Sequence, residues 1–218
     1  MNNIIDPTYL RTIFDGLLVD AIHKDNASAL PFGLDGIYEE ALPAEINFNG
    51  RKKFLEFFTV LALLKKEVSL DFVFRLLQGW PEEQVTGYIA QYSKWFNSPV
   101  SGRYVLYHDR LRKYILQRIS HNHFIRCNDN IINECKIALD LKVGDEWEHY
   151  ALEHLSKHLL INAMEGKDIK ALKILAYNTT HWNRQVQVSK KYEWSKRMHL
   201  DMLLWASKYE TMKSSSVC

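Results

Sequence analysis

The sequence predicts a mostly α-helical protein with one short β-hairpin near its middle. Glycine and proline are few, at 9 and 5 of the 218 residues, as is typical of chains with long uninterrupted helices. Apolar residues recur at the spacing of a helix face along most of the chain. The stretch from Trp95 to Ile119 differs, because it combines Pro and Gly with residues that alternate between two faces as in a strand.

Charge and cysteine usage narrow the class of protein. The 28 basic and 26 acidic residues leave a net charge of +2, so no global positive charge favours nucleic acid or a membrane surface. No apolar run reaches the roughly 18 to 20 residues that a membrane helix needs. Cys127, Cys135 and Cys218 form no CxxC pair, and an odd count does not indicate a disulfide framework. We therefore expect a cytoplasmic protein without membrane contact.

Residues 1–47 are predicted to form a small helical domain. Asp6-Pro7 is typical of a helix start, because Asp6 can cap the helix and Pro7 suits its first turn. Apolar residues then recur at helical spacing up to a loop at Lys24 to Gly33. A second helical pattern runs from Leu34 to Ile46.

Residues 48–120 are predicted to form a second domain, which contains the hairpin. Arg51 to Lys66 is the most apolar helix, which indicates burial on more than one side. Ser69 begins a short helix, and Pro81 begins another that continues through Lys94. The order helix, short helix, turn, helix and β-hairpin is typical of a winged-helix domain, a relative of the helix-turn-helix.

The hairpin leads into a corner and then a further helix. Arg103 to Tyr107 alternates between two faces, as expected of a strand. His108 and Asp109 follow directly, and Asp109 is placed to cap the next helix. The inward residues of that helix are predicted to be Leu111, Tyr114, Ile115 and Ile119.

Residues 121–213 are predicted to form a region of helical hairpins, followed by a disordered tail at residues 214–218. The lengths of the helices suit antiparallel stacked pairs similar to tetratricopeptide repeats, although no clean 34-residue period is present. The predicted helices are His123 to Leu141, Glu146 to Ala163, Lys167 to Tyr177, Trp182 to Lys190, and Trp194 to Lys213.

No residue pattern indicates catalysis by this chain. Neither GxxxxGK[ST] nor GxGxxG occurs, so nucleotide hydrolysis by the chain alone is not expected and no catalytic residue is assigned. His154 and His158 lie four residues apart and could share a helix face as metal ligands. They form no HExxH and have no evident third ligand, so no metal site is assigned. Cys127 and Cys135 are expected to be small core residues.

A winged helix also allows a DNA-binding alternative, in which the helical region would act as a sensor or dimerisation region. The helix that would enter the groove begins Pro81-Glu82-Glu83, and its acids would repel phosphate. Five basic residues cluster around the predicted hairpin, which is the wing of a winged helix. They could contact phosphate or simply form a solvated helix face, and we do not expect nucleic acid to be the main partner. Those basic residues around the predicted wing are Arg103, Arg110, Arg112, Lys113 and Arg118.

Four segments together resemble the region that follows the ATPase core in STAND-class nucleoside triphosphatases of the NACHT and AP-ATPase type. Their order and spacing match that family along nearly the whole chain. The segments are Asp6-Pro7-Thr8-Tyr9-Leu10, Leu30 to Tyr38 (LPFGLDGIY), Tyr107 to Ile115 (YHDRLRKYI) and Tyr150 to Leu160 (YALEHLSKHLL).

The resemblance implies a helical domain, a winged helix and the start of helical repeats. It also implies that Pro7 lies near the adenine of a bound nucleotide, and that His108 reaches the β-phosphate of ADP and holds a closed, inactive state. An imidazole can donate a hydrogen bond to a phosphate, which would make closure depend on the nucleotide. Without the family, Pro7 would be a helix-starting proline and His108 a corner residue.

The ATPase core of that family, with its P-loop, is absent from this sequence. The chain is therefore a fragment of a larger protein, a shortened relative that works in trans, or a scaffold that has lost nucleotide control. We expect no cofactor in the isolated chain, and ADP or ATP only where an ATPase domain is present. The expected partners are proteins: an ATPase domain in cis or trans, other protomers, and a sensed ligand protein.

Overall fold

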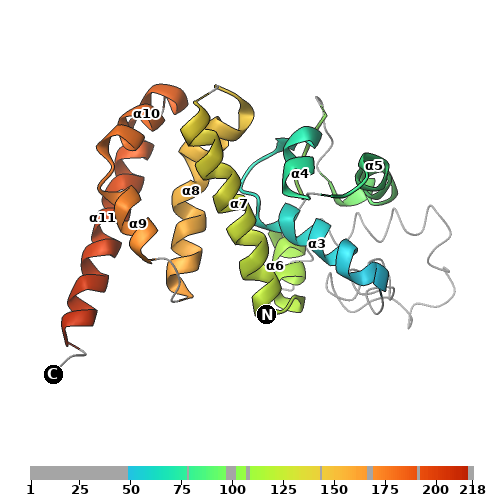
Figure 1. The fold of residues 1–218 in the computed structure, drawn as a ribbon, viewed down its shortest axis with the longest axis horizontal. Helices are drawn as coiled ribbons and strands as arrows, with labels where there is room; N and C mark the ends of the chain where they lie inside the picture. Colours follow the sequence, from blue (N-terminus) through green and yellow to red (C-terminus); the bar gives the residue numbers. More distant parts are fainter. Residues whose placement is uncertain are drawn as a thin grey trace, which may run out of the picture.

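The computed structural model describes residues 49–77, 79–96, 102–106, 109–142, 144–165, 169–190 and 192–215. The predicted helical domain at residues 1–47 lies outside them. Within the described residues the chain is mostly helical, with nine α-helices and one small two-stranded antiparallel sheet. The mostly α class predicted from the sequence is therefore confirmed (Figure 1).

Helix α3 (Asn49–Leu63) is the central helix of the first half of the described chain. Phe57 and Phe58 are at most 1% exposed. The ring of Phe57 lies 5.5 Å from that of Tyr88, and the ring of Phe58 lies 5.4 Å from that of Tyr92. On another side α3 packs against α6 and α7. The predicted burial on more than one side is confirmed.

Helix α4 (Leu70–Leu76) begins where the sequence predicts. The hydroxyl of the N-cap residue Ser69 accepts a hydrogen bond from the backbone N–H of Phe72 at 3.2 Å. Its buried side includes Phe72, Val73 and Leu76.

Helix α5 (Glu82–Gln91) follows Pro81, and two acids lie in its first turn as the helix dipole favours. It ends at Gln91 rather than at the predicted Lys94. The chain tightens there into a 3₁₀ turn, η3 (Ser93–Trp95), which buries Trp95.

The small sheet joins segments that lie far apart in the sequence. Strand β1 (Val68–Ser69) pairs antiparallel with β2 (Arg103–Tyr104). Phe96 and Leu106 form one further antiparallel bridge. The sequence predicts β2 but not β1, because two residues are too few to display an alternating pattern. Strand β2 therefore pairs mainly with β1. Of the predicted hairpin, the described residues contain one pairing, the bridge between Phe96 and Leu106.

Helix α6 (Asp109–Arg118) turns its predicted face inward, with Leu111, Tyr114 and Ile115 buried. Asp109 is the first residue of this helix, and its side chain is 88% exposed. A carboxylate in the first turn still favours the helix through the dipole. The predicted packing of α6 is confirmed for these three residues, whereas the fourth, Ile119, lies beyond the end of the helix and is only half-buried.

The second half of the chain consists of five helices with short connections. Each corresponds to a predicted helix, with ends that differ by up to three residues. The last helix continues two residues into the segment assigned to the tail. These helices are α7 (His121–Leu141), α8 (Glu146–Met164), α9 (Ile169–Ala176), α10 (Thr179–Ser189) and α11 (Tyr192–Ser215).

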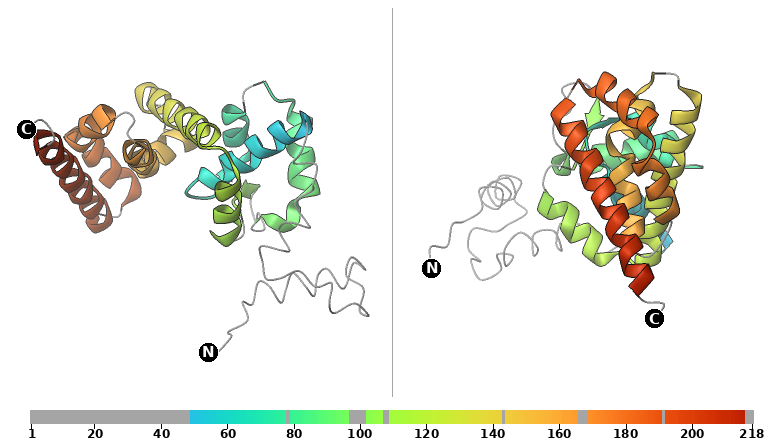
Figure 2. Two further views of the ribbon diagram at one scale, coloured as in Figure 1. Left: turned by 90° about the horizontal axis from the view of Figure 1, so that it is seen from below. Right: turned by 90° about the vertical axis from the view of Figure 1, so that its left-hand side faces the viewer.

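The five helices extend away from the α3–α6 part of the molecule (Figure 1). Helices α7 and α8 lie between that part and the last three helices in both Figure 1 and Figure 2. The strongest packing is between α7 and α8, and α8 then contacts both α9 and α10. Helix α11 packs against α9 and α10. Helix α8 is consequently buried on most of its surface.

Candidate functional site

Both residues that the family resemblance assigns to a nucleotide, Pro7 and His108, lie outside the described residues. The structure describes the two sides of the corner instead. Leu106 is buried and bridges to Phe96 on one side. On the other side α6 begins at Asp109, whose Oδ1 lies 3.9 Å from a guanidinium nitrogen of Arg112. The predicted roles of Pro7 and His108 stay predictions.

His158 lies in a buried chain of hydrogen bonds at the centre of the molecule. The backbone N–H of Lys65 donates to the hydroxyl of Tyr150 at 3.2 Å. The Tyr150 hydroxyl is 2.8 Å from Nε2 of His158, and Nδ1 of His158 is 2.7 Å from Oδ1 of Asn128. Because an amide oxygen only accepts, Nδ1 carries the proton and Nε2 accepts from Tyr150. Burial lowers the pKa of His158 well below its ordinary value, in agreement with this neutral form.

The chain of hydrogen bonds continues between α7 and α8. The amide nitrogen of Asn128 donates to the backbone oxygen of His158 at 3.0 Å and to Oδ1 of Asn162 at 2.7 Å. The amide nitrogen of Asn162 donates in turn to Asp129. Asn128, His158 and Asn162 are at most 2% exposed. These polar groups therefore specify how the two helices pack, because a shifted register would leave them unpaired.

These contacts bear on metal binding by His154 and His158. Both ring nitrogens of His158 are already in hydrogen bonds, so this imidazole offers no lone pair to an ion. No group of three or more His, Cys, Asp or Glu side chains among the described residues has an arrangement that could hold a metal ion. Both histidines face inward, as their four-residue spacing allows, but their partners are protein groups.

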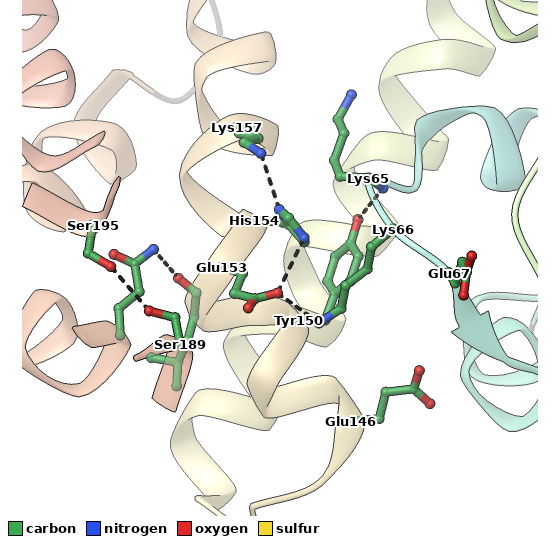
Figure 3. Close-up of polar contacts among 12 residues, drawn as sticks. Lys65, Lys66, Glu67, Glu146, Tyr150, Glu153, His154, Lys157, Ser189 and Ser195 are labelled. Atoms are coloured by element: carbon green, nitrogen blue, oxygen red, sulfur yellow. Dashed lines mark hydrogen bonds and ion pairs between the residues drawn. The ribbon is translucent and has the colours of Figure 1, made fainter. Parts of the chain in front are cut away.

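A cluster of ionic contacts joins the segment after α3 to helix α8 (Figure 3). Oε2 of Glu153 lies 2.8 Å from Nζ of Lys66 and 3.6 Å from Nε2 of His154. Nζ of Lys157 lies 3.4 Å from Nδ1 of His154 on the far side of that ring. Burial lowers the pKa of Lys157, and the charge of Glu153 opposes that shift. We call these four residues the junction cluster.

Other contacts extend this junction towards the sheet and α4. Glu146 accepts from the backbone N–H of Ser69 at 3.1 Å and from Arg103 at 2.9 Å. The rings of Phe72 and Trp147 are stacked, with centroids 3.5 Å apart and planes 5° from parallel. Stacked aromatic rings, ion pairs and hydrogen bonds thus join the two surfaces, and the buried apolar residues on both sides belong to one hydrophobic core. The two halves of the described chain therefore form one continuous packed unit.

A groove of about 530 Å³ opens between α7, α8, α9 and α10. Its floor is apolar and consists mainly of leucines, including Leu152, Leu155 and Leu159 of α8. Charged residues stand around it: Lys136, Asp140, Lys142 and Arg184. The start of α10 contributes Asn178, Thr180 and His181. We call this feature the leucine groove.

One side of the leucine groove is polar, and not all of its hydrogen-bonding groups have partners within the described part of the chain. Arg184 forms an ion pair with Glu148, which also accepts from the backbone N–H of Gly144 at 2.7 Å. His181 is 6% exposed, and its Nε2 has no hydrogen-bond partner among the described residues. The pKa of His181 is lowered to about 4, mainly by burial and further by the charges of His199 and Arg184. The imidazole is therefore neutral at pH 7.

The two central cysteines are inert core residues, as the sequence predicts. Cys127 and Cys135 are fully buried. Burial raises the pKa of Cys127 to about 12, so its thiol is protonated at pH 7 and is a poor nucleophile. The pKa of Cys135 is raised too, again mainly by burial.

Sequence reasoning did not find the leucine groove. Its residues come from four helices, and the residues of each helix also fit an ordinary amphipathic pattern. The available indication was the pair of helix ends at Lys142 and Asn178, where polar residues follow an apolar run. Nothing in such a pattern shows that the two ends meet in space.

The chain matches no protein-family model, and neither the curated proteins nor the solved structures compared with it contain a match. Across the described parts of the chain, no helix combines the length and the apolar character needed to cross a membrane.

Proposed function

We propose that this chain is a non-catalytic regulatory and protein-interaction portion of a STAND-type signalling nucleoside triphosphatase in the cytoplasm. Its first half closes on a nucleotide-bound ATPase domain, in the same polypeptide or in another. Its second half, helices α7 to α11, forms a helical array that senses or assembles protein partners. ADP or ATP belongs to that ATPase domain, with Pro7 and His108 completing the site. The isolated chain has no catalytic role.

The connectivity of the first half supports this proposal. Helix α3, strand β1, helices α4 and α5, and strand β2 follow one another in the order of a winged helix. The antiparallel pairing of β1 with β2, and the bridge between Phe96 and Leu106, support the proposal because a winged helix would contain a small sheet of this kind. The family resemblance assigns its nucleotide-reading histidine to the corner between this sheet and α6.

The observation that carries the proposal is the packed junction between that part and the helical array. A regulatory module must convert a movement at one end into a movement at the other, which requires a stiff connection. The stacked Phe72 and Trp147, the pairing of Arg103 with Glu146 and the junction cluster provide such a connection. A conformational change caused by partner binding to the helical array would therefore be transmitted to the corner that precedes α6.

A tag placed at the 3′ end of the natural gene tests the proposal, because it retains whatever is encoded with the chain. The protein purified from its own cells should contain or carry a P-loop ATPase domain, with ADP bound, and His108→Ala should release the ADP. Purification without any P-loop domain would contradict the proposal. The isolated 218-residue chain should show no ADP binding in calorimetry at micromolar concentrations.

The DNA-binding alternative receives less support from the contacts of the basic residues. Arg103 is paired with Glu146 at 2.9 Å, and the guanidinium of Arg118 lies 3.5 Å from the centre of the Tyr114 ring. Helix α5 exposes Glu82 and Glu83 in its first turn. This alternative predicts a salt-sensitive shift of duplex DNA that Arg103→Ala with Lys113→Ala weakens. The absence of a shift at low salt would exclude it.

A further inference from the structure

The leucine groove between α7, α8, α9 and α10 combines an apolar floor with a positively charged rim. Lys136 and Lys142 from the end of α7 and Arg184 from α10 line it, against one carboxylate, Asp140. Glu148 matches the charge of Arg184. The two lysines still outnumber the aspartate, so the rim favours an anionic occupant.

His181 adds a specific polar contact to this general attraction. It comes from the first turn of α10, lines the groove and is only 6% exposed. Its Nε2 lacks a hydrogen-bond partner among the described residues, although a buried polar nitrogen is destabilising when it is left unpaired. That nitrogen is enclosed, so a carboxylate oxygen of a ligand would accept a hydrogen bond from its protonated tautomer once the ring of His181 turns towards the groove.

The size and border of the groove indicate the kind of occupant. A volume of about 530 Å³ accommodates a few apolar side chains or one small molecule. Ile174 of α9 lines the groove and is 61% exposed, and Tyr177, just beyond the end of that helix, is 59% exposed. An occupant longer than the groove itself would cover both residues, which favours a peptide segment over a compact small molecule.

We propose that the leucine groove binds an acidic amphipathic peptide segment of a partner protein. Apolar side chains of the segment lie on the leucines of α8 and on Ile174, and its carboxylates lie between Lys136, Lys142 and His181. This inference deepens the proposed function and rests on it in one respect: it identifies the groove as the place where the helical array engages its protein partner.

Selection of phage-displayed random peptides of about a dozen residues on the purified chain tests this chemistry while the partner itself is still unidentified. We expect enrichment of peptides that combine Asp or Glu with Leu, Ile or Phe. Enrichment of basic or uncharged peptides, or of none, would overturn the proposal. No nucleotide or ATPase domain enters the experiment, so its failure is distinguishable from failure of the proposed regulatory function.

Matched variants locate the binding in solution, with fluorescence anisotropy of an enriched peptide as the readout. Lys142 and Lys190 both end a helix with positive φ, at 54° and 53°, but only Lys142 lines the groove. Lys142→Asn should weaken binding roughly fivefold, and added salt should reduce that difference, whereas Lys190→Asn should leave affinity within about twofold. Equal effects of the two variants would place the peptide elsewhere and overturn the proposal.

The apolar contact has a matched pair as well. Ile174 and Leu204 are both 61% exposed, and only Ile174 lines the groove. Ile174→Gln should weaken binding roughly tenfold and Leu204→Gln should not. On peptide addition the ring NMR signals of His181 should shift while those of the exposed His149 stay constant. Dodecanoate serves as a small-molecule competitor. If it binds the groove more tightly than every selected peptide and no peptide displaces it, the groove belongs to a small amphiphilic acid and the proposal is overturned.

Discussion

Replacing Tyr150 by phenylalanine removes one oxygen atom from the buried contact between the end of α3 and α8. That oxygen accepts from the backbone N–H of Lys65 at 3.2 Å and donates to Nε2 of His158 at 2.8 Å. Each lost hydrogen bond contributes about 1 kcal/mol, and His158 is fully buried, so its nitrogen cannot recover a partner from solvent. We expect Tyr150→Phe to lower the free energy of unfolding by about 2–3 kcal/mol.

Urea unfolding, followed by tryptophan fluorescence and by circular dichroism, measures this loss. Tyr177→Phe is the matched control, because Tyr177 is 59% exposed and its substitution should change the free energy by less than about 0.5 kcal/mol. Amide hydrogen exchange at Lys65 should also accelerate in Tyr150→Phe. Equal effects of the two variants would refute the directional chain from Lys65 through Tyr150 to His158.

Three further perturbations concern charge and backbone. Because burial lowers the pKa of His181 to about 4, the unfolded chain binds more protons between about pH 4 and 6.5. Stability should therefore fall as pH decreases through that window, by up to about 3 kcal/mol for this group, with a further loss from His158. Arg184→Met should lower the free energy of unfolding by about 3 kcal/mol, because Glu148 stays buried without its cation. Lys190→Gly should raise it by about 1 kcal/mol, because φ is 53° at this residue and glycine adopts that conformation without strain.

Each of these predictions has a measurement that separates it from a general effect. Urea unfolding at pH 7 and pH 5 should show a smaller pH dependence in His181→Gln than in the parent chain, and an unchanged dependence would contradict the pKa argument. Arg184→Met combined with Glu148→Gln should recover part of the lost stability, since the buried charge is then gone. A lower melting temperature in Lys190→Gly would contradict the assignment of backbone strain.

Local sequence patterns predicted the helices because each begins or ends with its own chemistry. Ser69 caps α4 through its hydroxyl, and Pro81 precedes the acids of α5. The inward face of α6 followed from the spacing of its apolar residues. Strand β1 was missed because its two residues become a strand only by pairing with β2, which lies far away in the sequence.

The candidate sites were less predictable because their side chains converge from different helices. The spacing of His154 and His158 correctly placed both on one face of α8. What His158 does there depends on Asn128 of α7 and on the end of α3, and no local pattern specifies those neighbours. The leucine groove is the stronger example. In the sequence His181 is an ordinary residue at a helix start, and only the folded chain brings it beside residues of α7 and α8.

The nucleotide-dependent closure of the α6 corner on an ATPase domain is the central claim, and lysine cross-linking tests it most directly. Lys113 is exposed on α6 beside the corner, whereas Lys196 is exposed on α11 at the other end of the array. In the natively tagged protein, Lys113 should cross-link to a P-loop domain with ADP and lose that link with a non-hydrolysable ATP analogue. Lys196 should form no such nucleotide-dependent link. Identical cross-links in both nucleotides, or none from Lys113, would contradict the account.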